Sequence, residues 1–137
     1  MYNGKNKAIT FSFDDGTTQD IRLIQILNKY HLKATFNMNS ELLGQKRILN
    51  CGAKNIEHNK NNMSDIKNIY NGHEVAAHTL THQNLVHIED DNEVIRQVEQ
   101  DRLNLSELVG YEVVGMAYPC GSKNCDARIA DIIEKNR

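Results

Sequence analysis

Short apolar, β-prone runs alternate with helical stretches about four times along the chain, and this alternation constrains the fold most. The expected strands are residues 7–13, 33–38, 73–77 and 113–118. The expected helices are residues 18–30, 64–70 and 91–109, and a last amphipathic stretch around 129–133. Strands that alternate with helices in this way form a parallel sheet with the helices outside it. The pattern therefore predicts an α/β fold with about four βα units, in an open sheet or part of a barrel.

The 137 residues are enough for a single domain with a hydrophobic core. The stretch 45–59 has the weakest pattern and contains only a short candidate strand at 55–58. Four βα units are half of an eight-fold barrel, and the sequence stops in or just after the last predicted helix. We therefore expect residues 1–137 to be one domain that lacks its C-terminal part.

Charge and cysteine content exclude several classes of protein. Charged residues make up 25% and the net charge is −2, whereas a nucleic-acid-binding protein normally carries a basic patch. The apolar runs are too short to span a membrane. The three cysteines are an odd number without Cys-x-x-Cys spacing, which fits a reducing compartment better than a disulfide framework. No signal-peptide stretch precedes the first strand, so we expect a cytoplasmic location. The oligomeric state is not predicted.

Two adjacent carboxylates, Asp14 and Asp15, follow the first predicted strand and precede Gly16. Adjacent acids repel each other, so stability alone explains the pair poorly. One interpretation is a tight Asp-Gly turn in which Asp14 caps the next helix. The other is that one carboxylate holds a metal ion while its neighbour handles a proton.

Two histidines, His78 and His82, lie four residues apart at the end of the strand predicted at 73–77. This spacing suits one metal ion, although two histidines satisfied within the protein would give the same pattern. One Asp with two His is a ligand set that leaves positions on a divalent metal open for water. The carboxyl ends of parallel strands gather at one rim of a sheet, so Asp14, Asp15, His78 and the segment 119–121 are expected there together. This shared position favours the metal interpretation.

These motifs resemble those of a known family, the polysaccharide deacetylases, which are the NodB-like domain of carbohydrate esterase family four. Residues 11–16 (Phe-Ser-Phe-Asp-Asp-Gly) resemble the first motif of that family, and residues 72–82, which end in His-Thr-Leu-Thr-His, resemble the second. Residues 117–121 (Ala-Tyr-Pro-Cys-Gly) resemble the third, which is usually Arg-x-Pro-aromatic-Gly. The resemblance covers nearly the whole chain and implies a distorted, incomplete (β/α) barrel.

The resemblance also implies a role for each residue of these motifs. Asp14 corresponds to the general base, and Asp15, His78 and His82 correspond to the ligands of a divalent metal ion, usually Zn²⁺. The implied reaction is hydrolysis of an N- or O-acetyl group on a carbohydrate. The oxyanion would be stabilised by the metal and by a backbone N–H, which by position is that of Cys120.

Two departures from the family pattern leave other functions open. The arginine of the third motif is Ala117 here, and the later motifs, which carry the histidine that acts as general acid, are absent. A non-catalytic metal- or carbohydrate-binding remnant and a small-molecule metal amidohydrolase are therefore the alternatives. Outside the motifs, His31, His58 and His87 are interpreted as surface or core residues. The Cys120 thiol is not expected to be a nucleophile, because no histidine is placed by the sequence to activate it.

Overall fold

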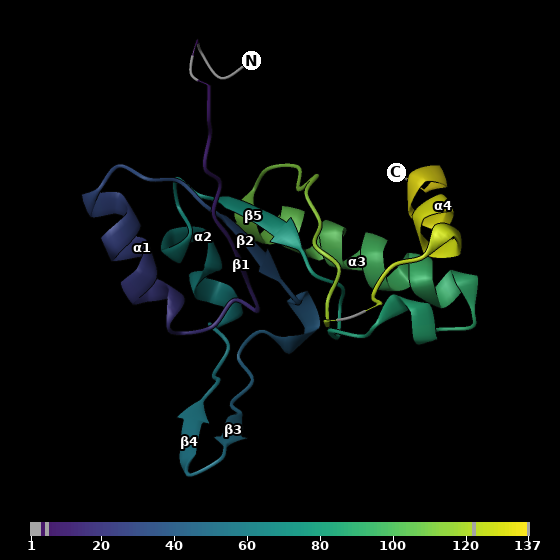
Figure 1. Ribbon diagram of the computed structural model, residues 1–137, viewed down its shortest axis with the longest axis horizontal. Coiled ribbons are helices and arrows are strands. Elements are labelled where there is room, and N and C mark those ends of the chain that lie inside the picture. Colours follow the sequence, from purple (N-terminus) through teal and green to yellow (C-terminus); the bar gives the residue numbers. More distant parts are fainter. Residues whose placement is uncertain (1–3, 5, 122, 137) are drawn as a thin grey trace.

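A computed structural model describes residues 4, 6–121 and 123–136 (Figure 1). Most of the residues on which the prediction about a signal peptide depends lie outside that range. Three parallel strands form the central sheet in the order β1-β2-β5, and their bounds are Ser12–Asp14, Thr35–Met38 and Glu74–Ala77. The described residues form four α-helices: α1 (Asp20–Lys29), α2 (Ile66–Ile69), α3 (Asp91–Val109) and α4 (Ala127–Lys135), the last of which packs against α3. Single 3₁₀ turns lie at Ser40–Leu42, Met63–Asp65 and Leu85–His87.

The α/β class is confirmed, with parallel strands and outer helices in a sheet that does not close into a barrel within the described residues. Each parallel connection passes through helix: α1 lies between β1 and β2, and α2 precedes β5. None of the helices in the described part of the chain combines the length and apolar character of a membrane span.

The prediction of a fourth strand at residues 113–118 is wrong, because this segment does not form a regular strand. Only Met116 forms a parallel bridge, to Ala77, through hydrogen bonds from Ala77 N–H to Gly115 O and from Ala117 N–H to Ala77 O, both 2.9 Å. Gly115 weakens the segment as a strand, and Val114 is 66% exposed. The first strand is also shorter than predicted, because it begins at Ser12 and Ile9 is 74% exposed.

A β-hairpin that was only partly predicted projects from the body of the molecule between β2 and α2 (Figure 1). Its strands β3 (Ile48–Cys51) and β4 (Lys54–Glu57) are antiparallel and joined by a two-residue turn. Gly52 has φ 65° at the first turn position, where a residue without Cβ is favoured. We call residues 45–60 the hairpin arm.

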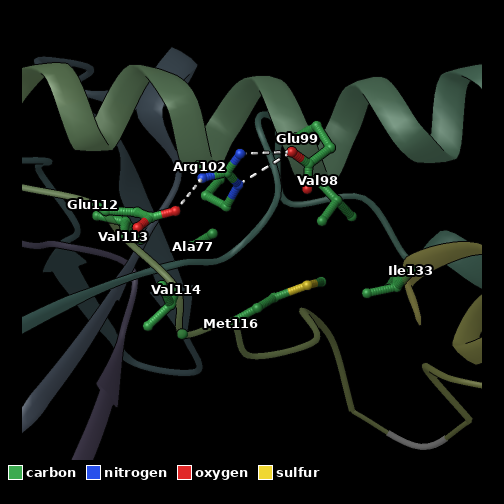
Figure 2. A pocket seen from close by; sticks show the side chains of 10 residues that line it. Ala77, Val98, Glu99, Arg102, Glu112, Val113, Val114, Met116 and Ile133 are labelled. Carbon is green, nitrogen blue, oxygen red and sulfur yellow. Dashed lines mark hydrogen bonds and ion pairs between the residues drawn. The ribbon is translucent and has the colours of Figure 1, made fainter. Parts of the chain in front are cut away.

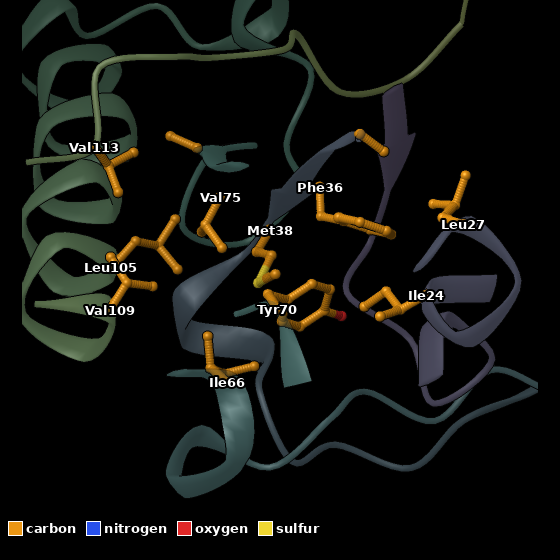
Figure 3. Close-up of a cluster of buried hydrophobic side chains, with 12 residues drawn as sticks. Ile24, Leu27, Phe36, Met38, Ile66, Tyr70, Val75, Leu105, Val109 and Val113 are labelled. Atoms are coloured by element: carbon orange, nitrogen blue, oxygen red, sulfur yellow. The ribbon is translucent and has the colours of Figure 1, made fainter. Parts of the chain in front are cut away.

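The main hydrophobic core lies between the sheet and three helices. Figure 3 shows Ile24 and Leu27 of α1, Leu105 and Val109 of α3, and the buried Phe36 of β2 converging. A second cluster joins the N-terminal half of α3 to α4, through Leu85, Val94, Val98, Ile129 and Ile132. The apolar positions of α3 therefore contact two clusters, which explains why this long helix crosses most of the molecule.

Capping side chains fix where the two C-terminal helices begin. Asp90 accepts a hydrogen bond from Asn92 N–H at 2.9 Å at the start of α3, and Asp126 accepts one from Ile129 N–H at 3.0 Å at the start of α4. At the other end of α3, Gly110 has φ 81° and takes the left-handed position that ends helices. The predicted bounds 91–109 of α3 are confirmed.

A buried polar network ties α1 to Tyr70, which directly follows α2, and to Asn61, which directly follows the hairpin arm. The Tyr70 hydroxyl donates to Asp20 at 2.7 Å and accepts from the Asn61 amide at 2.9 Å. Burial raises the pKa of Asp20 to about 6, although the hydrogen bond from Tyr70 acts in the opposite direction. Folded and unfolded chains therefore bind different numbers of protons at mildly acidic pH.

Asp20→Asn is expected to remove part of the pH dependence of stability. The folded state keeps the Asp20 proton up to about pH 6, while the unfolded chain loses it near 3.8, so this carboxyl makes the free energy of unfolding fall as pH rises between these values. The loss from pH 4 to pH 7 is about 2 kcal/mol. Urea unfolding at both pH values should show a smaller fall in Asp20→Asn than in wild type. An equal fall would mean that Asp20 is ionised in the folded protein across this range.

Candidate metal centre

Three side chains that could hold a metal ion meet at the carboxyl ends of β1 and β5. Asp15 directly follows β1, His78 directly follows β5, and His82 lies four residues further along the same loop. One ligand atom from each lies within 4.8 Å of the others. Asp15 Oδ1 is 3.6 Å from His82 Nε2, and the two imidazole rings are 5.0 Å apart at 72°. The structure thus brings together the three residues that the motifs singled out.

His78 is held from several directions. Its ring Nδ1 lies 2.9 Å from the Ala117 carbonyl oxygen, which can only accept a hydrogen bond, so Nδ1 carries the proton and Nε2 has a free lone pair. Its backbone N–H donates to Met38 O at 2.8 Å and to Asp101 at 2.9 Å. Burial lowers the pKa of His78, which favours the neutral imidazole that binds metals.

Left-handed backbone is concentrated at this site. Of the five described non-glycine residues with positive φ, four lie here: Asp15 at 82°, Thr79 at 64°, His82 at 59° and Cys120 at 70°. Such conformations are costly for residues with a Cβ and persist where the surrounding structure requires them, often at functional sites. The left-handed backbone conformation at these residues therefore sets the direction in which their side chains point.

The ligand geometry fits a small divalent ion. Two ligands about 2.0–2.1 Å from a zinc ion at a tetrahedral angle lie about 3.3 Å apart. The Asp15–His82 separation of 3.6 Å is close to that value, and the whole set needs only small movements. Two imidazoles and one carboxylate also leave coordination positions open for water or substrate.

Asp15 has two further partners that the sequence did not predict. The Lys60 ammonium donates to Asp15 Oδ1 at 2.8 Å and to its backbone carbonyl at 2.7 Å, and His58 Nε2 lies 3.3 Å from Asp15 Oδ2. Burial alone would raise the pKa of Asp15, but Lys60, His82 and His58 together hold it below its usual value. The interpretation of His58 as an ordinary surface or core residue is wrong, because it contacts a candidate ligand.

Backbone hydrogen bonds fix the end of the hairpin arm against the site. Lys60 forms an antiparallel bridge with Thr17, Asn61 N–H donates to Gly16 O at 3.0 Å, and Thr18 N–H donates to Asn59 O at 2.9 Å. The Lys60 side chain is only 8% exposed. The fold therefore holds the Lys60 ammonium next to Asp15, and this ion pair is largely buried.

Lys60→Met is expected to raise the affinity for zinc by about tenfold. Two cations that share one carboxylate repel each other, and a divalent and a monovalent ion about 5 Å apart do so by roughly 1.7 kcal/mol even in bulk water. The same change should destabilise the metal-free protein, because Asp15 loses its closest cation. Competition against a chromophoric chelator measures the affinity, and Lys54→Met, in the exposed part of the arm, is the control. Weaker binding by Lys60→Met would instead show that Lys60 holds Asp15 in position for the metal.

The other two predicted site residues lie beside this group. Asp14 ends β1 and is exposed, and its Oδ1 accepts a hydrogen bond from the Asn37 amide at 2.7 Å. Cys120 Sγ lies 3.8 Å from the His82 carbonyl oxygen and 4.0 Å from His82 Nδ1. A histidine thus lies next to this thiol, which the sequence did not predict. The roles of Asp14 as base and of the Cys120 N–H as oxyanion donor stay predictions.

A pocket of about 390 Å³ opens directly beside the candidate ligands. Asp15, Leu42, Thr81 and His82 line one side, and five residues of the hairpin arm line the other: Gln45, Arg47, Leu49, His58 and Lys60. A second pocket of about 400 Å³ lies between α3, the segment 112–116 and α4 (Figure 2). Its charged residues are already paired, since Arg102 contacts Glu99 at 2.9 Å and Glu112 at 3.9 Å. Of these two pockets, the one at the hairpin arm is the one that adjoins the candidate metal ligands.

Comparison with known families identifies one that matches almost the whole chain. The family model described as polysaccharide deacetylase matches residues 2–135. A curated relative, YheN of Bacillus subtilis, is 25% identical over 123 residues, which cover 88% of this chain and 38% of that protein.

Solved structures share the fold at low sequence identity. The Streptococcus pyogenes deacetylase PplD, solved in complex with acetate, superposes with a TM-score of 0.75 and 20% identity over 97% of this chain and 54% of that one. A mutant of a CE4 family pseudoenzyme, with restored enzymatic activity, gives a TM-score of 0.72 and 21% identity over 96% of this chain and 43% of that one. The chain thus spans about half the length of these structures.

Proposed function

The chain belongs to the polysaccharide deacetylase family, and we propose on this basis that it is a metal-dependent hydrolase that removes N- or O-acetyl groups from a carbohydrate. The observation that carries the proposal is the meeting of Asp15, His78 and His82 within 4.8 Å of one another, with Asp14 directly before Asp15 in the sequence. A divalent ion held by these three residues, zinc by preference, would supply Lewis acidity that polarises the acetyl carbonyl and makes water easier to deprotonate.

Each residue of the candidate site has a distinct part in the proposed reaction. Asp15, His78 and His82 would hold the ion, and the Ala117 carbonyl fixes the tautomer and direction of the His78 ring. Asp14 takes the proton of the attacking water, and the Asn37 amide orients its carboxylate. The backbone N–H of Cys120 donates to the oxyanion that develops on the acetyl carbonyl.

The test is release of acetate from N-acetylglucosamine oligomers by the purified protein supplied with zinc. Protein treated with a chelator is the control, and zinc added back should restore the reaction. Acetate release that does not depend on a metal would contradict the proposal.

A non-catalytic binding function is the second candidate. It is favoured by Ala117 at the position where the family usually has arginine, and a structurally similar CE4 protein is itself a pseudoenzyme. Stoichiometric zinc binding together with glycan binding, but without acetate release, would favour this candidate over the hydrolase.

A further inference from the structure

The hairpin arm makes one wall of the pocket beside the candidate metal centre, and this wall is cationic. Residues 45–60 contain Lys46, Arg47, Lys54 and Lys60 against a single carboxylate, Glu57. The arm therefore carries a formal charge of +3 in a chain whose net charge is −2. Charge of one sign gathered along one wall of a cleft favours ligands of the opposite sign.

The register of the hairpin places Arg47 on the pocket side of the arm, whereas Lys46 and Lys54 do not line the cavity. Leu49 pairs with Ile56 and Ile48 pairs with Glu57 across the two strands. Neighbouring residues of a strand point to opposite faces, so Arg47 and Leu49 share one face while Ile48 and Glu57 share the other. Arg47 and Leu49 line the pocket, and Glu57 does not. The one acidic side chain of the arm thus faces away from the cavity.

Arg47 is the cation of the pocket that remains available for a ligand. The Lys60 ammonium is already bonded to Asp15. The Arg47 backbone is fixed, because its N–H donates to Asn59 Oδ1 at 3.2 Å and its carbonyl accepts from His58 N–H at 2.7 Å. Its side chain is exposed at the pocket, and no acidic partner for it is found among the described residues. A guanidinium on a fixed backbone can bind a carboxylate through two parallel hydrogen bonds.

We propose that the pocket selects a carbohydrate with a carboxylate on or next to its acetylated sugar, and that Arg47 is the residue that binds this carboxylate. The inference rests on the proposed function, since it takes the acetylated carbohydrate as the ligand. A pocket of about 390 Å³ falls in the range of small-molecule sites, roughly 300–1,000 Å³. The candidate ligands His82 and Asp15 line the same cavity, so a sugar bound there has its acetyl group near the metal position.

The experiment compares two matched glycans that differ only in charge. One is an N-acetylated oligosaccharide containing N-acetylmuramic acid, and the other is the same oligosaccharide with its carboxylate converted to an amide. Binding of each to the zinc-supplied protein is measured by calorimetry, and acetate release is followed in parallel. Wild type should bind the carboxylate form about tenfold more tightly, the scale of one charge-assisted hydrogen-bond pair.

Arg47→Gln should reduce this preference to about one. The matched control is Arg22→Gln, an exposed arginine on α1 outside the pocket, which should keep the wild-type preference. Equal binding of the two glycans by wild type, or an unchanged preference in Arg47→Gln, would overturn the inference. If the preference depends on Arg47 but no acetate is released from either glycan, the inference stands and the proposed hydrolase function fails.

Discussion

Asp14→Asn is expected to slow acetate release by the zinc-supplied protein by about 10²–10⁴-fold, the range over which a positioned general base contributes. Asn has nearly the same shape as Asp but cannot accept a proton at neutral pH. Burial lowers the pKa of His78 and the negative charge of Asp14 opposes this effect, so the Asp14 carboxylate lies close to the candidate ligands. The substituted amide keeps an oxygen that can accept the hydrogen bond from Asn37.

The zinc affinity of the same variant distinguishes a general base from a metal ligand at position 14. Asp14→Asn leaves Asp15, His78 and His82 in place but removes one negative charge near the metal position, so the affinity for zinc should fall by no more than about tenfold. Asp131→Asn, which changes an exposed carboxylate on α4, should affect neither measurement. A variant that keeps more than a tenth of wild-type activity would place the base elsewhere, and one that loses zinc would make Asp14 a ligand.

The meeting of Asp15, His78 and His82 could be predicted from the sequence because parallel strands end at the same edge of a sheet. More than sixty residues separate Asp15 from His78, yet both directly follow a strand of the β1-β2-β5 sheet. Alternation of strand and helix is a regular pattern in the sequence. The edge of the sheet at which these residues lie can therefore be predicted without knowing how the side chains pack.

Lys60 and His58 could not be predicted, because no local pattern links them to Asp15. They reach it only through the contacts of residues 59–61 with residues 16–18, which form when the chain folds. One sequence signal for the hairpin itself existed in Gly52, which begins the two-residue turn between the strands. The strand predicted at 113–118 was wrong for a related reason. Apolar β-prone residues describe a tendency, whereas a strand also needs a partner ladder, and this segment bridges β5 only at Met116.

His82→Ala is expected to lower the affinity for zinc by about 100-fold or more. Loss of a residue that only orients a ligand typically costs 10- to 100-fold, so loss of a ligand itself should reach at least the upper end. The His82 side chain is 34% exposed, which keeps the packing cost of removing its ring small. The free energy of unfolding of the metal-free protein should therefore change by less than about 1 kcal/mol.

The control for this prediction lies in the same part of the chain. His87 is exposed, follows His82 by five residues and does not line the pocket, so His87→Ala should bind zinc as wild type does. Chelator competition measures both variants, and urea unfolding verifies that both remain folded. Unchanged zinc affinity in His82→Ala would remove His82 from the ligand set.

Such a result would point first to His58, whose Nε2 lies 3.3 Å from Asp15 Oδ2 on the other side of the carboxylate. The variant His58→Ala distinguishes the two arrangements. If His82 is the ligand, His58→Ala should retain zinc, because within the described residues the His58 side chain pairs with Asp15 and with neither candidate histidine ligand. If His58 is the ligand, the affinity should collapse in His58→Ala and persist in His82→Ala, and the metal would then lie on the hairpin-arm side of Asp15.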